Sequence, residues 1–202
     1  MKFAYVFMYN GSMKDESLTE ITISYIKALF SGNADGHDAD HSLRVYKNAV
    51  TIASNYPECD LVLVSLASLL HDVDDHKLFQ TENNANARDF LKGQDIPEDT
   101  IEQIVRIINA VSFSKNKGKT PETLEGKIVQ DADRLDAMGA IGIARTFAYG
   151  GKKGRSLDDS VQHFHDKLLL LRNTLNTDEA RKLAGKRHEF MEKFLEELSE
   201  ET

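Results

Sequence analysis

Apolar residues recur along most of this chain at intervals of three and four, the spacing of one face of an α-helix. The segment 16–30 shows this pattern clearly, with Leu18 and Tyr25 seven residues apart on one face. A second segment, 38–56, stops before Pro57, because a helix interior does not tolerate proline. Alternating patterns typical of half-buried strands are nearly absent. We therefore expect an all-α fold.

The segment 60–75 is apolar nearly all round, unlike its amphipathic neighbours. A helix of that kind is covered on every side, so we expect it at the centre of the domain. Further helices are expected at about 81–93, from 97 onward, at 124–149 with a bend near Ala132, at 157–175 and at 177–200. The pattern predicts a single helical bundle of about seven to nine helices over residues 16–202, with residues 1–15 as a peripheral N-terminal extension.

Composition and charge narrow the classes of function. The 202 residues are 41% hydrophobic and 29% charged, which is enough apolar material for one substantial core. A net charge of -8 argues against binding a nucleic acid duplex. The longest apolar run, 61–70, is half of what a membrane helix needs, so no membrane contact is expected. The single cysteine, Cys59, excludes an internal disulfide and favours a cytoplasmic protein.

Three of the seven histidines are followed directly by aspartate, but in a chain with 33 acidic residues such a pair alone means little. His165 and Asp166 lie in a polar helical segment and are expected on a solvated face. His71 and Asp72 differ, because they close the most apolar segment of the chain. Asp75, four residues after His71, falls on the same helical side.

Two other segments carry histidines or carboxylates next to apolar residues. GHDADHSLRVY places His37 and His41 four residues apart, and KIVQDADRLDAMGA contains Asp131, Asp133 and Asp136. Any one of these residues alone suits a helix cap, a satisfied core histidine or an ion pair. Together they indicate a bound cation, because burying this many carboxylates without one costs several kcal/mol per ion. Imidazole and carboxylate ligands suit Mn²⁺, Mg²⁺, Co²⁺, Fe²⁺ or Zn²⁺.

The order of these groups resembles the H…HD…D signature of the HD-domain metal-dependent phosphohydrolases. The matching segments are GHDADHSLRV, LLHDVDDHK and VQDADRLDAMGAIGIARTF, and the resemblance covers about 18–198. They look like a small stand-alone bacterial subgroup in which Mn²⁺-dependent pyrophosphohydrolase activity on nucleoside triphosphates is known. The resemblance implies an HD-type helical bundle and a divalent metal ion, Mn²⁺ before the alternatives above. The metal ligands that it implies are His41, His71, Asp72 and Asp133.

The same resemblance assigns roles to the neighbouring residues. Asp133 is preferred to Asp131 as the last ligand, because ADRL matches the ADxL context of the family. Asp131 and Asp136 would then orient ligands or cap a helix. Asp75 occupies the position of an acid that helps to activate water in several relatives, where it is often Glu. Ala137 replaces the asparagine of a relative that hydrolyses alarmone nucleotides, which argues against that substrate.

Phosphoryl chemistry also needs positive charge near the phosphate oxygens. The residues expected to bind substrate are His37, Arg44, Lys77 and Arg145, with Arg134, Lys115 and the loop 152–155 as further candidates. Arg44 alternatively pairs with an acid such as Asp40. The expected partner is a small phosphorylated substrate, a nucleotide above all, and a homodimer is possible.

The expected reaction is hydrolysis of a nucleoside triphosphate to monophosphate and pyrophosphate. Alternatives with the same fold are a nucleoside monophosphatase, a phosphodiesterase and a metal-bearing regulatory module without turnover. A di-iron oxygenase would need further ligands, and His76 is the evident spare histidine near His71.

Overall fold

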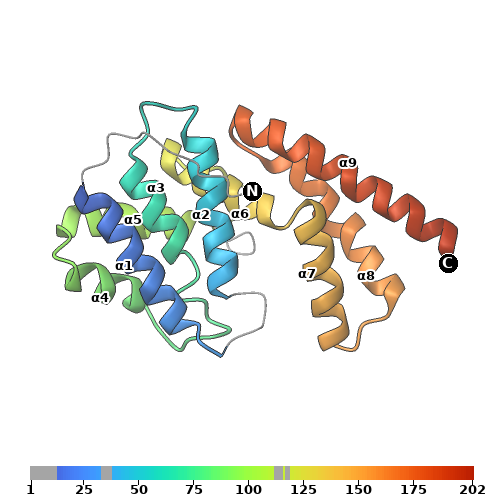
Figure 1. Ribbon diagram of the computed structural model, residues 1–202, viewed down its shortest axis with the longest axis horizontal. Coiled ribbons are helices and arrows are strands. Elements are labelled where there is room, and N and C mark those ends of the chain that lie inside the picture. Colours follow the sequence, from blue (N-terminus) through green and yellow to red (C-terminus); the bar gives the residue numbers. More distant parts are fainter. Residues whose placement is uncertain (1–12, 33–37, 112–115, 117–118) are drawn as a thin grey trace, which may run out of the picture.

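The computed structural model describes residues 13–32, 38–111, 116 and 119–202, with side chains from 17 onward. Within these residues the chain forms nine α-helices, and no strand is present (Figure 1). The all-α expectation is confirmed. Most of the expected N-terminal extension lies outside the described residues. The predicted substrate-binding residues His37 and Lys115 also lie outside them.

The bounds of the helices are as follows. They are α1 (Met13–Leu29), α2 (Ala39–Ala53), α3 (Leu61–Leu70), α4 (Ala85–Gly93), α5 (Glu98–Val111), α6 (Leu124–Asp136), α7 (Gly139–Lys152), α8 (Leu157–His163) and α9 (Asp178–Glu201). A π turn, η1 (Phe164–Leu168), and a 3₁₀ turn, η2 (Leu169–Thr174), follow α8. None of the described helices is long and apolar enough to cross a membrane.

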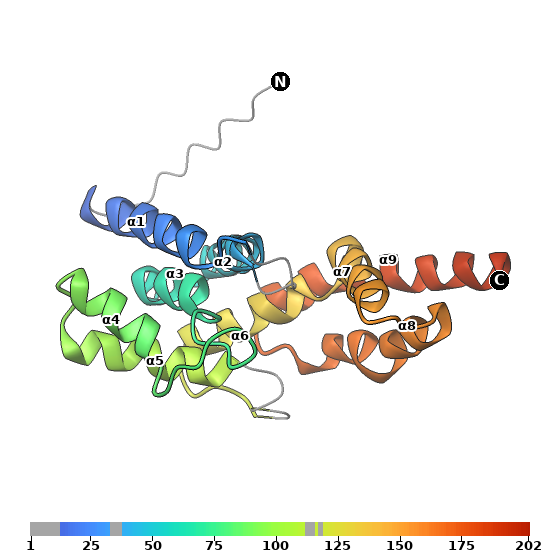
Figure 2. The ribbon, with the colours of Figure 1, turned by 90° about the horizontal axis from the view of Figure 1, so that it is seen from below.

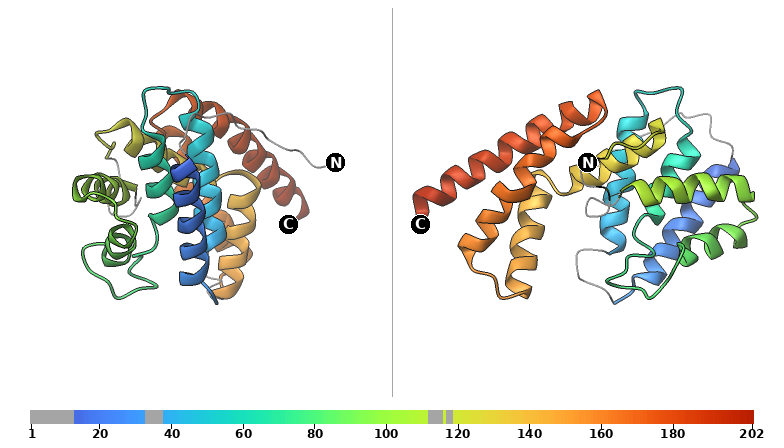
Figure 3. Two further views of the ribbon diagram at one scale, coloured as in Figure 1. Left: turned by 60° about the vertical axis from the view of Figure 1, so that its left-hand side comes forward. Right: turned by 180° about the vertical axis from the view of Figure 1, so that it is seen from behind.

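The helices form two groups. Helices α1 to α6 make a bundle, and α7, α8, the two turns and α9 make an arm beside it (Figure 1). Seen from below, α6 reaches from the bundle to the arm and α9 extends outward beyond it (Figure 2). The view from behind shows the same division (Figure 3). Helix α9 packs against α6 and α7, so the arm is held to the bundle along α6.

Helix α3 lies at the centre of the bundle, where it packs against α1, α2, α5 and α6. All its residues from Leu63 to Leu70 are buried, as its apolar composition predicts. The helix ends at Leu70, however, and not near Asp75 as expected. In the turn that follows, the carboxylate of Asp74 accepts the backbone N–H groups of Asn86 and Ala87 at 3.0 Å each. Asp74 thus caps the first turn of α4.

The helix expected at 124–149 is two helices. The chain breaks after Asp136 and not near Ala132, and α7 starts at Gly139 with φ of +70°, a conformation that favours glycine. The close approach also requires Gly142, because a Cβ there would lie 2.3 Å from the carbonyl oxygen of Ala137. This break turns α7 away from α6 and makes it the first helix of the arm.

The arm has its own aromatic core. The rings of Phe147, Phe164 and Phe194 pack with centroids 5.7 to 6.4 Å apart, joining α7, the π turn and α9. The expected helix 157–175 is therefore interrupted, since η1 and η2 replace its second half.

A buried carboxylate ties the start of α9 to α6. Asp131 accepts the backbone N–H groups of Asn176 and Thr177 at 2.8 Å each, and the Thr177 hydroxyl at 2.7 Å. Burial raises the pKa of Asp131, although these hydrogen bonds act to lower it. Asp131 therefore anchors the residues that lead into α9, and Thr177 itself caps that helix.

Candidate active site

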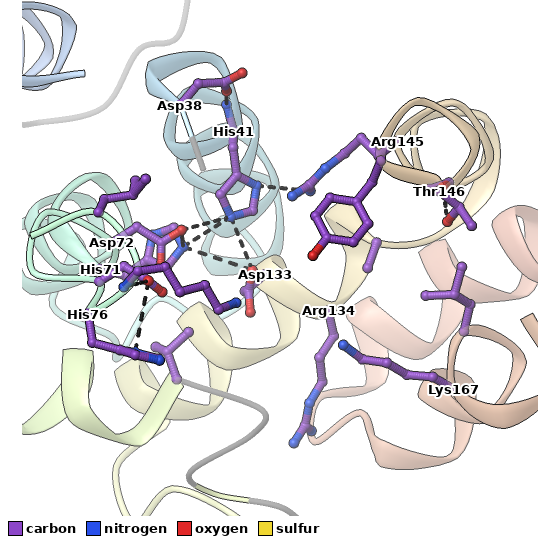
Figure 4. A pocket seen from close by; sticks show the side chains of 18 of the residues that line it. Asp38, His41, His71, Asp72, His76, Asp133, Arg134, Arg145, Thr146 and Lys167 are labelled. Carbon is purple, nitrogen blue, oxygen red and sulfur yellow. Dashed lines mark hydrogen bonds and ion pairs between the residues drawn. The ribbon is translucent and has the colours of Figure 1, made fainter. Parts of the chain in front are cut away.

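The four residues implied as metal ligands come from three helices and converge (Figure 4). His41 stands in the first turn of α2, where Asp38 caps the helix by accepting the backbone N–H of His41 at 2.8 Å. His71 closes α3, Asp72 follows it, and Asp133 projects from α6. The apolar faces of α2, α3 and α6 pack together, and this packing brings the polar ends into one place.

The ligand atoms lie close together. The Nε2 atoms of His41 and His71 are 3.2 Å apart, and Asp72 Oδ2 lies 3.4 Å from each of them. Asp133 Oδ1 lies 3.4 Å from Nε2 of His41 and 3.9 Å from that of His71. For comparison, neighbouring ligands of an octahedral ion with bonds of about 2.1 Å lie about 3 Å apart.

Hydrogen bonds fix which ring nitrogens carry hydrogen. His41 Nδ1 lies 2.7 Å from Asp136 Oδ2, and His71 Nδ1 lies 2.9 Å from the carbonyl oxygen of Ser68. Both partners only accept hydrogen bonds, so each Nδ1 is the donor. In the neutral rings both Nε2 atoms then present lone pairs to each other and to two carboxylates. This donor set fits a divalent cation and suits nitrogen and oxygen ligation.

The charges within the cluster reinforce one another. Burial lowers the pKa of His41, but hydrogen bonds to Asp133, Asp136 and Asp72 outweigh burial and raise the pKa well above its ordinary value. Burial raises the pKa of Asp133, yet the hydrogen bond with His41 brings the net pKa below its usual value. The carboxylates therefore favour positive charge at the centre of the cluster.

Asp136 holds His41 from behind. Its carboxylate is buried, and it accepts Nε of Arg44 at 2.7 Å, Nη2 of Arg44 at 3.1 Å and Nη1 of Arg145 at 2.5 Å, besides the His41 ring. Burial raises the pKa of Asp136, but His41 and Arg44 bring it far below the usual range. Arg44 thus pairs with Asp136 and not with Asp40. It is also not among the described residues that line the pocket, whereas its predicted role was to bind substrate.

The turn after α3 carries the proposed general base. Asp75 Oδ1 accepts the backbone N–H of Lys77 at 2.8 Å, which fixes the orientation of the carboxylate. Asp75 and Lys77 both line the pocket described next, although α3 does not extend to them. The side chain of His76 is 68% exposed and lies 3.9 Å from Asp75.

A pocket of about 840 Å³ opens beside the cluster, between the bundle and the arm. The bundle side contributes the proposed ligands, Asp75 and Lys77. The other side is basic, and its cations come from the end of α6, the arm helix α7, the loop after it and the π turn. They are Arg134, Arg145, Lys152, Lys153, Arg155 and Lys167.

Lys167 is the residue that sequence reasoning missed. It belongs to the segment interpreted as a solvated face, and its neighbours His165 and Asp166 are indeed exposed. Lys167 itself is half-buried and lines the pocket (Figure 4). Burial lowers its pKa, while the charge of Asp133 raises it. Lys167 lies three residues after Phe164 and four before Leu171, both buried, so helical spacing places it beside the buried face.

Comparison with known proteins gives a matching family and a similar bacterial protein. Residues 38–138 match the family model described as HD domain. The protein YpgQ of Bacillus subtilis is 37% identical over 198 residues, covering 94% of this chain and 96% of YpgQ.

Solved structures agree. The crystal structure of Bacillus subtilis YpgQ in complex with ADP matches with a TM-score of 0.80 and 34% identity, covering 94% of this chain and 97% of that one. The crystal structure of an HD-superfamily hydrolase from Bacillus thuringiensis matches with a TM-score of 0.78 and 37% identity, covering 93% and 97%. The chain therefore belongs to the HD domain family, close to small bacterial HD-superfamily hydrolases such as these.

Proposed function

We propose that this HD-superfamily hydrolase converts nucleoside triphosphates to nucleoside monophosphates and pyrophosphate, with a divalent metal ion, Mn²⁺ first among the candidates. One observation carries the proposal. A donor set for a cation and a group of lysine and arginine side chains face the same pocket from opposite sides. A polyphosphate needs both, because its oxygens bind a metal ion at the reacting bond and further cations along the tail.

The ion-binding role falls to His41, His71, Asp72 and Asp133. The hydrogen bonds of His41 to Asp136 and of His71 to Ser68 already orient both imidazole rings with Nε2 toward the centre of the cluster. When bound, a divalent ion polarises a phosphoryl oxygen and lowers the pKa of a coordinated water.

Asp75 is the proposed general base. One carboxylate oxygen is held by the N–H of Lys77, and within the described part of the chain no donor occupies the other. That oxygen takes the proton of the attacking water. The water oxygen bonds to the α-phosphorus, the bond from that phosphorus to the α–β bridging oxygen breaks, and pyrophosphate leaves.

The phosphate tail is assigned to the basic side of the pocket. Lys167 and Arg145 are the central residues. Lys167 is close enough to Asp133 to interact with its charge, and Arg145, which also pairs with Asp136, lines the pocket. The volume of about 840 Å³ falls within the range of nucleotide-sized ligand pockets, about 300–1,000 Å³. The complex of YpgQ with ADP supports a nucleotide ligand for this chain.

Product analysis by chromatography tests the proposal. The full chain is incubated with Mn²⁺ and a panel of nucleoside mono-, di- and triphosphates and cyclic nucleotides, with the His71→Ala/Asp72→Ala variant as control. Monophosphate and pyrophosphate from triphosphates, absent in the control, would support a pyrophosphohydrolase. Free nucleoside from monophosphates would instead indicate a nucleotidase, and opening of cyclic nucleotides a phosphodiesterase. Bound metal without turnover of any substrate would reject nucleotide hydrolysis.

A further inference from the structure

A second, smaller pocket lies at the junction of α6, η2 and the start of α9. Its volume is about 380 Å³. It is lined by Lys119, Thr120, Lys127, Arg134, Asn173, Thr174, Leu175, Asn176 and Arg181. Four of these residues are basic, and none of the described lining residues is acidic.

The cation in the wall of this pocket is Arg134, whose side chain is almost wholly buried, with 5% of the residue exposed. Its Nη1 donates to the carbonyl oxygen of Thr174, but its Nε has no hydrogen-bond partner within the described residues. Figure 4 shows the side chain extending from α6 away from the two histidines. Burial lowers the pKa of Arg134, while the charges of Asp131 and Asp133 act to raise it.

Arg134 also lacks a counter-charge. The carboxylates of Asp131 and Asp133 act on its charge only at longer range, and no ion pair joins Arg134 to a carboxylate of the described residues. The oxygens of Asp131 are occupied by Asn176 and Thr177, and Asp133 faces His41. A buried cation without a paired anion lowers the stability of the folded protein, and a bound anion would remove that cost.

The other basic residues supply the rest of the site. Lys127 is half-buried on α6 and Lys119 is exposed. Arg181 is already oriented, because it donates to Asp178 at 2.6 Å and to the carbonyl oxygens of Leu175 and Asn176. The volume of this pocket is near the lower end of the range for ligand sites. With these cationic donors, the pocket suits a compact ligand that carries several negative charges.

We propose that this second pocket binds a small oxyanion of the phosphate class on Arg134, Lys127 and Arg181. The site is separate from the one proposed for the nucleotide, and binding there requires no metal ion and no hydrolysis. Arg134 lines both pockets and directly follows Asp133 in α6, so an anion bound here contacts the residue next to a proposed ligand.

Calorimetric titration with inorganic phosphate tests the proposal on the full chain, with and without Mg²⁺. Lys127→Gln is compared with Lys152→Gln, which removes the same charge from the nucleotide pocket. We expect Lys127→Gln to weaken phosphate binding about ten-fold, by loss of one charge-assisted contact. Lys152→Gln should leave that affinity within about two-fold, and Mg²⁺ should not change it. Thermal melting followed by circular dichroism verifies that both variants fold.

The backbone amide signals of residues 173–176 give a second measurement, because phosphate should shift them and Lys127→Gln should suppress the shift. Titration with a nucleoside monophosphate distinguishes a free anion from a phosphate carried on a nucleoside. If Lys127→Gln weakens binding of the nucleoside monophosphate as much as it weakens binding of phosphate, the pocket binds a phosphate carried on a nucleoside. Equal weakening by both variants, weakening by Lys152→Gln alone, or no phosphate binding by the native chain would overturn the proposal.

Discussion

The two sides of the active-site pocket are built differently. On the bundle side, His41 and Asp136 are buried, and each polar atom is oriented by a named partner on another helix. On the arm side, Lys152, Lys153 and Arg155 are exposed, and Lys153 and Arg155 lie over the aromatic face of Tyr149. A rigid donor set suits one ion and one geometry, whereas exposed basic side chains add positive charge without fixing one geometry. We therefore expect changes on the bundle side to abolish chemistry and changes on the arm side to alter affinity.

The largest effect is expected on the bundle side at Asp72. Asp72→Ala removes one of the four proposed ligands, so bound metal and turnover should fall together to background. Metal content by mass spectrometry and the rate with a nucleoside triphosphate measure both. Asp158→Ala, at an exposed position of α8, should change neither. Full metal occupancy in Asp72→Ala would contradict the ligand assignment.

A change at Asp75 separates catalysis from metal binding. Asp75→Asn keeps the size of the side chain and removes the base, so we expect metal content to stay near native while kcat falls about 10²- to 10⁴-fold. Undiminished turnover would show that another group activates the water, and loss of metal would place Asp75 among the ligands.

Asp136 tests how far the orientation of His41 matters. Asp136→Asn removes the charge that holds the Nδ1 hydrogen of His41, and the affinity for the metal ion should fall about 10- to 100-fold. Adding excess metal should recover most of the activity, since the ligands remain. An affinity unchanged by Asp136→Asn would mean that packing alone orients the ring.

The smallest effect is expected on the arm side. Lys167→Gln should raise KM for a nucleoside triphosphate about ten-fold through loss of one charge-assisted contact, with a smaller change in kcat. His165→Gln changes an exposed residue two positions away and should leave both parameters within about two-fold. A large loss of kcat in Lys167→Gln would erase the distinction between the two sides.

The helical fold was predictable from the sequence because its evidence is local. Apolar spacing reveals α2 and α5, and the apolar composition of α3 reveals its central place. The ends of helices were less predictable, since they depend on distant partners. Asp74, just after the end of α3, accepts two backbone N–H groups of α4, and Arg187 of α9 donates to the carbonyl oxygen of Leu135 at the end of α6.

The candidate site shows the same contrast. The histidines and aspartates of the bundle side stand in short motifs and could be recognised together. The acid that pairs with Arg44 could not be identified from the sequence, because Asp136 is 92 residues away. Lys167 was missed because it was grouped with its exposed neighbours His165 and Asp166. It stands three residues after Phe164 and four before Leu171, both buried, a spacing that places it beside the buried face of a helix.

The break between α6 and α7 has a consequence for the size of the substrate. Asp133 lies before Gly139 and Arg145 lies after it, and each belongs to a rigid helix. The span between a proposed metal ligand and the nearest guanidinium of the arm thus depends on the backbone torsions at this corner, together with the bond from Arg145 back to Asp136 of α6. One residue inserted at that corner would rotate α7 by about 100°. We expect such a chain to bind its metal ion as before, because the proposed ligands stay in place. The cations of α7 would no longer face the proposed phosphate tail, so this corner would limit the length of substrate that fits.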